Sequence, residues 1–163
     1  MEITRAHSAN HIEEIRRLFR EYETFLAVDL CFQGFEDELA GLPGQYAPPD
    51  GALLIAVENQ KAAGCVALRK LEDGICEMKR LFVRPQYRCR GLGRMLAERI
   101  IDKAARLGYT SMYLDTLDKL KEALHLYESL GFKLRKPYYP NPLPGVLYWE
   151  LDLKHLKDVD HEQ

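Results

Sequence analysis

The sequence predicts an α/β fold in one domain. Apolar residues recur with helical spacing over residues 9–28 and 92–107, which is typical of amphipathic helices. Residues 52–83 instead form short apolar runs separated by brief polar turns, and the Asp73-Gly74 pair among them is a strong hairpin signal. Helices and strands therefore follow one another along the chain, and no linker or internal repeat divides it.

Seven strands and four helices are expected, in the order β-α-α-β-β-β-α-β-α-β-β. The strands are predicted at residues 2–6, 52–58, 62–71, 75–83, 109–114, 132–136 and 146–153. The helices are predicted at residues 9–28, 35–42, 92–107 and 119–130. Glycine and proline make residues 41–51 a loop, and a second proline-rich loop separates the last two strands.

Capping residues set the expected helix boundaries. Ser8 can cap the first helix and Asp118 the fourth, because their side-chain oxygens can accept hydrogen bonds from the free N–H groups of a first turn. Gly108 and Gly131 follow the third and fourth helices, where a left-handed glycine commonly ends a helix.

Composition narrows the class of protein. The chain has 163 residues, 47% hydrophobic and 29% charged, as in an ordinary globular domain. No apolar run approaches the roughly 20 residues of a membrane span, and the first residues lack the pattern of a signal peptide. The formal net charge of −2, with mixed signs, argues against nucleic-acid binding. We expect a cytoplasmic protein, independent of membranes, with one domain at residues 1–153 and a polar tail at 154–163; a homodimer stays open.

The four cysteines predict neither a metal site nor a disulfide framework. Cys31, Cys65, Cys76 and Cys89 show no C-x-x-C spacing, and three of them sit among apolar residues. We expect free thiols, mostly buried, and no bound metal.

A basic, glycine-spaced turn at residues 83–94 follows an apolar strand and opens directly into a helix. The first turn of a helix has N–H groups without partners and the positive end of the helix dipole. Gly91 and Gly93 carry no Cβ, so an anion can approach the backbone closely. Three arginines add positive charge, at Arg88, Arg90 and Arg94. The turn is therefore predicted to bind a phosphate group.

Three segments form a series of motifs: a strand at residues 77–83, the glycine-spaced turn at 88–93 and a tyrosine-containing helix at 123–132 that ends in Gly-Phe. In these motifs the chain resembles the GNAT superfamily of N-acetyltransferases. Arg88-x-x-Gly91-x-Gly93 resembles the family's acyl-CoA pyrophosphate loop. Residues 77–83 look like its central strand, and residues 123–132 look like its tyrosine-containing helix, which ends in Gly-Phe. The resemblance implies a mixed, twisted sheet of about seven strands with helices on both faces.

The resemblance also implies acetyl-CoA as the acyl donor, with no metal. In this family two neighbouring strands separate, and the pantetheine arm lies between them. By position, the backbone of Leu81, Phe82 and Val83 would pair with that arm. The pyrophosphate would be held by Arg88, Cys89, Arg90, Gly91, Leu92, Gly93 and Arg94. One departure is Leu120, which stands where many relatives have an asparagine that contacts pantetheine.

Two catalytic residues follow from the same resemblance. Tyr127 matches the tyrosine that hydrogen-bonds or protonates the departing thiolate; its helical spacing also fits a core residue. Glu77 is the candidate general base, because a lysine-like amine is almost wholly protonated at pH 7 and must lose a proton before it attacks. A salt-bridged strand glutamate is the alternative. Strand alternation predicts that Glu77, Lys79 and Leu81 share one face.

The resemblance also implies that the acceptor is recognised by the first two helices, at residues 25–42, and by the loop between the last two strands. Tyr138, Tyr139 and Asn141 offer rings and hydrogen-bonding groups there, and Tyr46 can join them. We therefore expect transfer of acetyl to a primary amine of a small molecule by direct attack in a ternary complex. The alternatives are a protein or peptide amine as acceptor, or an acyl-CoA-binding sensor without turnover.

Overall fold

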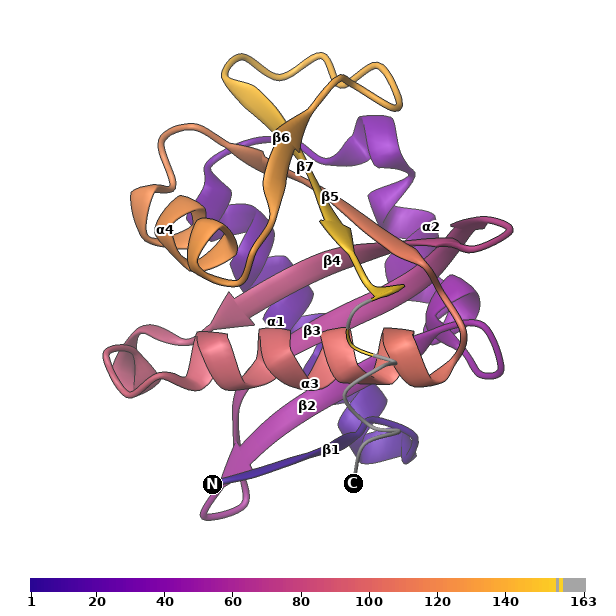
Figure 1. Ribbon diagram of the computed structural model, residues 1–163. Coiled ribbons are helices and arrows are strands. Elements are labelled where there is room, and N and C mark those ends of the chain that lie inside the picture. The colour runs from indigo at the N-terminus through magenta and orange to yellow at the C-terminus, as the bar shows by residue number, and fades with distance from the viewer. Residues whose placement is uncertain (155, 157–163) are drawn as a thin grey trace.

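The computed structural model describes residues 1–154 and 156, so most of the tail expected at 154–163 lies outside the described residues. Within that range seven strands form one sheet in the order β1-β2-β3-β4-β5-β7-β6 (Figure 1). The strands are β1 (Glu2–Arg5), β2 (Ala52–Glu58), β3 (Lys61–Glu72), β4 (Ile75–Val83), β5 (Ser111–Leu117), β6 (Lys133–Arg135) and β7 (Val146–Asp152). The helices are α1 (Ala9–Leu26), α2 (Phe35–Ala40), α3 (Leu92–Arg106) and α4 (Lys121–Ser129). The predicted class and element order are confirmed.

Helices cover both faces of the sheet (Figure 1). On one face, Leu96 and Ile100 of α3 and Tyr127 of α4 join the apolar side chains of β3 and β4 in one buried cluster. On the other face, Leu18 of α1 and Phe35 of α2 belong to a second cluster. The sheet therefore separates two cores, and each is closed by the apolar stripe of an amphipathic helix.

The predicted helix starts are right for α1 and wrong for α4. The Ser8 hydroxyl accepts the N–H of His11 at 3.1 Å, as a capping serine does. Asp118 does not cap α4, which begins at Lys121 without a side-chain cap. The reason lies in the sheet, because pairing with β7 extends β5 to Leu117 and draws the following residues away from the helix.

β4 and β5 are the only parallel neighbours in the described sheet, and they pair over three residues only. Their register ends with Glu77 opposite Tyr113, and the rest of each strand runs on without the other. Beyond this point β4 is bonded to β3 and β5 to β7, so the two halves of the sheet diverge. The separation of two neighbouring strands implied by the resemblance is confirmed here.

A bulge in β4 reverses the side-chain alternation. Pairing with β3 slips between Lys79 and Phe82, so that Arg80 and Leu81 together stand opposite one residue of β3. Arg80 has a φ of 60°, which is uncommon for a residue other than glycine. Leu81 packs on the α3 side, whereas Lys79 contacts the segment between α1 and α2. The expectation that Leu81 shares a face with Glu77 is therefore wrong.

Candidate active site in the cleft between β4 and β5

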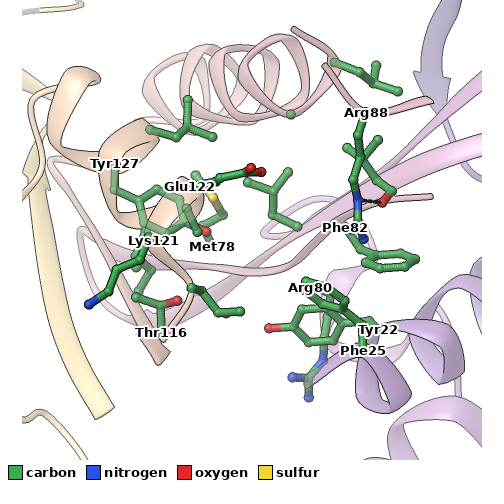
Figure 2. Close-up of a pocket in the computed structure, with 18 of the residues that line it drawn as sticks. Tyr22, Phe25, Met78, Arg80, Phe82, Arg88, Thr116, Lys121, Glu122 and Tyr127 are labelled. Atoms are coloured by element: carbon green, nitrogen blue, oxygen red, sulfur yellow. Dashed lines mark hydrogen bonds between the residues drawn. The ribbon is translucent and has the colours of Figure 1, made fainter. Parts of the chain in front are cut away.

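A cleft of about 620 Å³ opens where β4 and β5 separate (Figure 2). Both strands line it, and the loop before α3 closes one end. The start of α4 and two aromatic side chains of α1 complete the walls. The contributing segments are residues 78–83, 87–89, 91–93, 114–116 and 119–123, with Leu126, Tyr127, Tyr22 and Phe25.

The loop before α3 exposes backbone N–H groups to this cleft. Within the described residues, the N–H groups of residues 89–94 have no hydrogen-bond acceptor; the first backbone bond of α3 runs from Met95 to Gly91 at 3.1 Å. Gly91 has a φ of 74°, and a Cβ built there would meet nothing within 4 Å. A row of free N–H groups at a helix N-terminus, with open space before it, is suited to bind a phosphate group.

The arginines of the loop divide into two sets. Arg88 lines the cleft, where its Nε donates to the Val83 carbonyl at 2.9 Å and its guanidinium lies 4.5 Å from the ring centroid of Phe25 (Figure 2). Arg90 and Arg94 are exposed and are not part of the cleft lining; Arg90 pairs with Glu58 at 2.8 Å. Cys89, Leu92 and Gly93 line the cleft.

Tyr127 reaches the cleft from α4 and is buried (Figure 2). Its ring packs against Phe132 with the centroids 5.7 Å apart, and its hydroxyl has no hydrogen-bond partner among the described residues. Burial raises the pKa of Tyr127 well above its ordinary value, and the charges of Tyr22 and Asp115 raise it further. The hydroxyl is therefore a protonated donor at any physiological pH. Leu120 also lines the cleft.

Glu77 does not line the cleft. Its side chain is 0% exposed, and its Oε1 lies 2.7 Å from Nε of Arg69. Its other oxygen accepts a hydrogen bond from the Tyr138 hydroxyl. Both oxygens are therefore engaged in internal contacts, which is the arrangement of the salt-bridged alternative.

A carboxylate that sequence reasoning missed, Asp115 of β5, does line the cleft. It accepts hydrogen bonds from the Tyr139 hydroxyl and, at 2.9 Å, from Nδ2 of Asn141. It forms no ion pair with any described residue. The predicted strand ends at Leu114, which places Asp115 in a loop. The sequence feature that could have identified Asp115 is an acidic residue directly after an apolar run. A carboxylate without an ion-pair partner, in the same cleft as the hydroxyl of Tyr127, is a suitable proton acceptor.

The loop between β6 and β7 is anchored by its tyrosines. Tyr138 donates to Glu77, Tyr139 to Asp115, and the Tyr148 hydroxyl to the Tyr139 carbonyl at 2.8 Å. Burial, followed by the charge of the adjoining carboxylate, raises the pKa of both Tyr138 and Tyr139. These tyrosines and Asn141 thus gather at one end of the cleft, although none of them is among its lining residues.

Tyr46 lies elsewhere, contrary to the expectation that it joins this wall. It is 2% exposed and packs edge-on against Phe19, with ring centroids 6.2 Å apart. The 3₁₀ turn at Gly44–Tyr46 turns the ring inward under α1. Among the thiols, Cys65 and Cys76 are buried as expected, whereas Cys31 and Cys89 are exposed.

In the part of the chain that the structure describes, no three His, Cys, Asp or Glu side chains are grouped so as to hold a metal ion. None of the described helices has the length and apolar character needed to cross a membrane.

Comparison with known proteins places the chain in a family. The family model described as "Acetyltransferase (GNAT) family" matches residues 12–132. An N-acetyltransferase of Schizosaccharomyces pombe is 46% identical over 144 residues, which cover 87% of this chain and 88% of the relative. A Streptococcus agalactiae acetyltransferase has a similar structure, with a TM-score of 0.79 and 26% identity over 93% of this chain and 97% of that one. The PaiA N-acetyltransferase of Thermoplasma acidophilum, solved with coenzyme A, has a TM-score of 0.73 and 18% identity over 93% and 99%. The chain belongs to the GNAT family of acetyltransferases.

Proposed function

We propose that this protein transfers the acetyl group of acetyl-CoA to a primary amine of a small molecule, by direct attack in a ternary complex. One observation carries the proposal. A single cleft connects a loop of free backbone N–H groups, the buried hydroxyl of Tyr127 and the unpaired carboxylate of Asp115. These are an anion site, a proton donor and a proton acceptor in one continuous space.

The residues of the cleft fit acetyl-CoA, which supplies the acyl group already activated as a thioester. The free N–H groups at Gly91–Gly93 and the guanidinium of Arg88 would hold the pyrophosphate. The separated edge of β4 at residues 81–83 offers backbone groups to the pantetheine amides in the manner of an added strand. The PaiA protein of the same fold was solved with coenzyme A, which supports this donor.

Asp115 and Tyr127 then have complementary roles. A primary amine has a pKa near 10.4 in water and must be neutral to attack, so Asp115 accepts its proton directly or through water. The raised pKa of Tyr127 keeps its hydroxyl protonated, and the hydroxyl donates a hydrogen bond to the sulfur as negative charge develops there. The oxygens of Glu77 are occupied by Arg69 and Tyr138, so Glu77 supports the wall instead.

A hydrogen bond across the acceptor end favours a small molecule over a protein chain. Nε2 of Gln33, between α1 and α2, donates to the Tyr139 hydroxyl at 3.0 Å. This bond joins the 3₁₀ turn at Cys31–Gln33 to the β6–β7 loop, two segments far apart in sequence. A peptide acceptor needs an open groove along this side, and the bridge narrows it. Asp115 and Tyr127 both line the cleft, which favours an enzyme over a sensor without turnover.

Calorimetric titration with acetyl-CoA, followed by a free-thiol assay on a panel of small primary amines, tests the proposal. We expect saturable binding and thiol release that depends on the amine. Binding without release on any small amine would contradict the small-molecule acceptor. The absence of binding would contradict the use of acetyl-CoA altogether.

A further inference from the structure

Lys79 is a buried cation at the acceptor end whose charge is poorly compensated. Its side chain is 9% exposed, and the residue lines the cleft. Its nearest carboxylate is Oε1 of Glu77, 3.8 Å from Nζ, and that same oxygen is already held by Arg69 at 2.7 Å. The remaining contact of Nζ is the neutral side-chain oxygen of Gln33, at 3.3 Å.

The neighbouring cations are either paired with a carboxylate or exposed. Both Nε and a terminal nitrogen of Arg80 contact the carboxylate of Glu38 at 3.0 Å. Lys119 and Lys121 also line the cleft but are exposed, and Lys119 donates to the carbonyl of Leu26, at the end of α1, at 2.7 Å. Among the lysines that line the cleft, Lys79 is therefore the one that combines a largely buried ammonium with no close carboxylate.

The bulge in β4 makes the position of Lys79 costly. It turns Arg80 toward the same side, and both cations share the side-chain oxygen of Gln33, at 3.3 and 2.9 Å. Burial lowers the pKa of Lys79, and the charge of Arg80 lowers it further, while Glu77 and Asp115 offset part of this effect. Burial of an incompletely paired ammonium is unfavourable. An anion bound beside Nζ would offset this free-energy cost.

Lys79 and Asp115 stand on opposite sides of the gap. The register of β4 and β5 ends with Glu77 opposite Tyr113, so two residues further along each strand Lys79 follows on one side and Asp115 on the other. A hydrogen-bonded chain connects them, from Nζ of Lys79 through Gln33 to the Tyr139 hydroxyl and then to Asp115. A cation and an anion are thus fixed at one end of the cleft.

We propose that the acceptor is an amino acid or a close analogue, in which Lys79 binds the carboxylate while the amine faces Asp115. This inference rests on the proposed function and names its substrate class. An amine without an anionic group would leave the Lys79 ammonium buried and uncompensated, so the site would discriminate against it.

Paired acceptors test the proposal: each of the common L-amino acids and its carboxamide, assayed by thiol release from acetyl-CoA. The carboxamide keeps the same side chain and amine but carries no negative charge. Its amine is also the less basic of the two, so a preference for the acid cannot arise from easier deprotonation. We expect kcat/KM at least about tenfold higher for the acid of each accepted pair, in line with one charged hydrogen bond.

Variants of Lys79 assign the preference to this residue. In Lys79→Gln, the ratio of kcat/KM for the acid to kcat/KM for the carboxamide should fall close to one, mainly because KM for the acid rises. Lys79→Arg keeps a positive charge and should retain part of that ratio. Lys103→Gln, an exposed position of α3, should leave the ratio unchanged. Calorimetric binding of acetyl-CoA shows that each variant is folded and loaded.

The outcomes separate this inference from the function on which it rests. Equal or faster turnover of the carboxamides overturns the amino-acid acceptor and leaves the acetyltransferase proposal standing. A Lys79→Gln variant in which kcat/KM falls equally for the acid and for its carboxamide also overturns it. Acetyl-CoA binding without thiol release on either series, while another small primary amine is acetylated, overturns the inference alone. No release on any small amine refutes the small-molecule function, and the inference falls with it.

Discussion

Nε of Arg69 lies 2.7 Å from Oε1 of Glu77, and the side chain of Glu77 is wholly buried. The Tyr138 hydroxyl donates a hydrogen bond to the other oxygen of this carboxylate. The pair ties β3, β4 and the β6–β7 loop together at the point where β4 and β5 stop pairing. It therefore supports the acceptor end of the cleft, and the carboxylate available for proton transfer is Asp115.

Glu77→Gln should lower stability and leave catalysis nearly intact. The amide cannot neutralise Arg69, which is 26% exposed, so we expect a loss of about 1–3 kcal/mol in the free energy of unfolding, less than for a fully buried pair. Urea unfolding measures the loss, and kcat should stay within a few-fold. Glu150→Gln, at a partly exposed pair with Arg135, is the matched control and should cost less. A hundredfold lower kcat with unchanged stability would restore Glu77 as the base.

Asp115→Asn should reduce kcat by about 10² or more, the usual effect of removing a general base. The amide oxygen can still accept from Tyr139 and Asn141, so the loop should remain in place. Acetyl-CoA affinity, measured by calorimetry, should not change. Asp102→Asn, on the exposed face of α3, controls for loss of one negative charge. Wild-type turnover in Asp115→Asn would exclude this carboxylate as the base.

Local patterns predicted most of the fold. β2 and β4 have the predicted bounds, because alternation and the Asp73-Gly74 turn both fix them. The errors occur where pairing with a strand distant in sequence sets the end of an element. β5 runs to Leu117 because β7 lies beside it, and nothing in the local sequence near Asp118 indicates that partner.

The candidate site was less predictable, because it depends on a backbone irregularity. The bulge at Arg80 decides that Leu81 and Lys79 face opposite ways, and no glycine or proline marks it in the sequence. The anion loop was recognisable because it consists of consecutive residues. Asp115 and Lys79 lie at the same end of the cleft because β4 and β5 stop pairing just before them. The point at which two strands stop pairing is a tertiary feature that local sequence does not indicate.

Gly91→Val should weaken acetyl-CoA binding at least about tenfold. A Cβ at Gly91 meets nothing within 4 Å in the protein and would occupy the open space before the free N–H groups. The φ of 74° also costs a valine about 1–2 kcal/mol in this left-handed region. Gly108→Val controls for that strain, because Gly108 has a φ of 97° and open surroundings at the other end of α3. Calorimetry should show a loss of affinity for Gly91→Val only; equal affinities would refute the pyrophosphate assignment.

Tyr127→Phe should lower kcat by about 10- to 100-fold, the value of a hydrogen bond to a charged group. Stability should change little, because the hydroxyl has no described hydrogen-bond partner and the ring contact with Phe132 is kept. Since its pKa is raised, Tyr127 stays protonated beyond pH 10, and the wild type and the variant should share the same pH profile up to that point. Equal turnover of the two proteins would make Tyr127 a packing residue.

Lys79→Met should raise the melting temperature at pH 7. Burial and then the charge of Arg80 lower the folded-state pKa of Lys79 below 10.5, so between that lowered pKa and 10.5 the unfolded chain binds more protons than the folded one. Stability therefore rises with pH through this window, and below it the full cost of the buried ammonium is present. Methionine removes that cost, so the advantage of the variant should shrink as the pH approaches 10.5. Thermal unfolding at pH 7, 9 and 10.5 measures the difference, and Lys103→Met at an exposed site should show none. A variant less stable than the wild type at pH 7 would mean that Glu77 and Gln33 already compensate the charge, and the physical reason for an anionic acceptor at Lys79 would be lost.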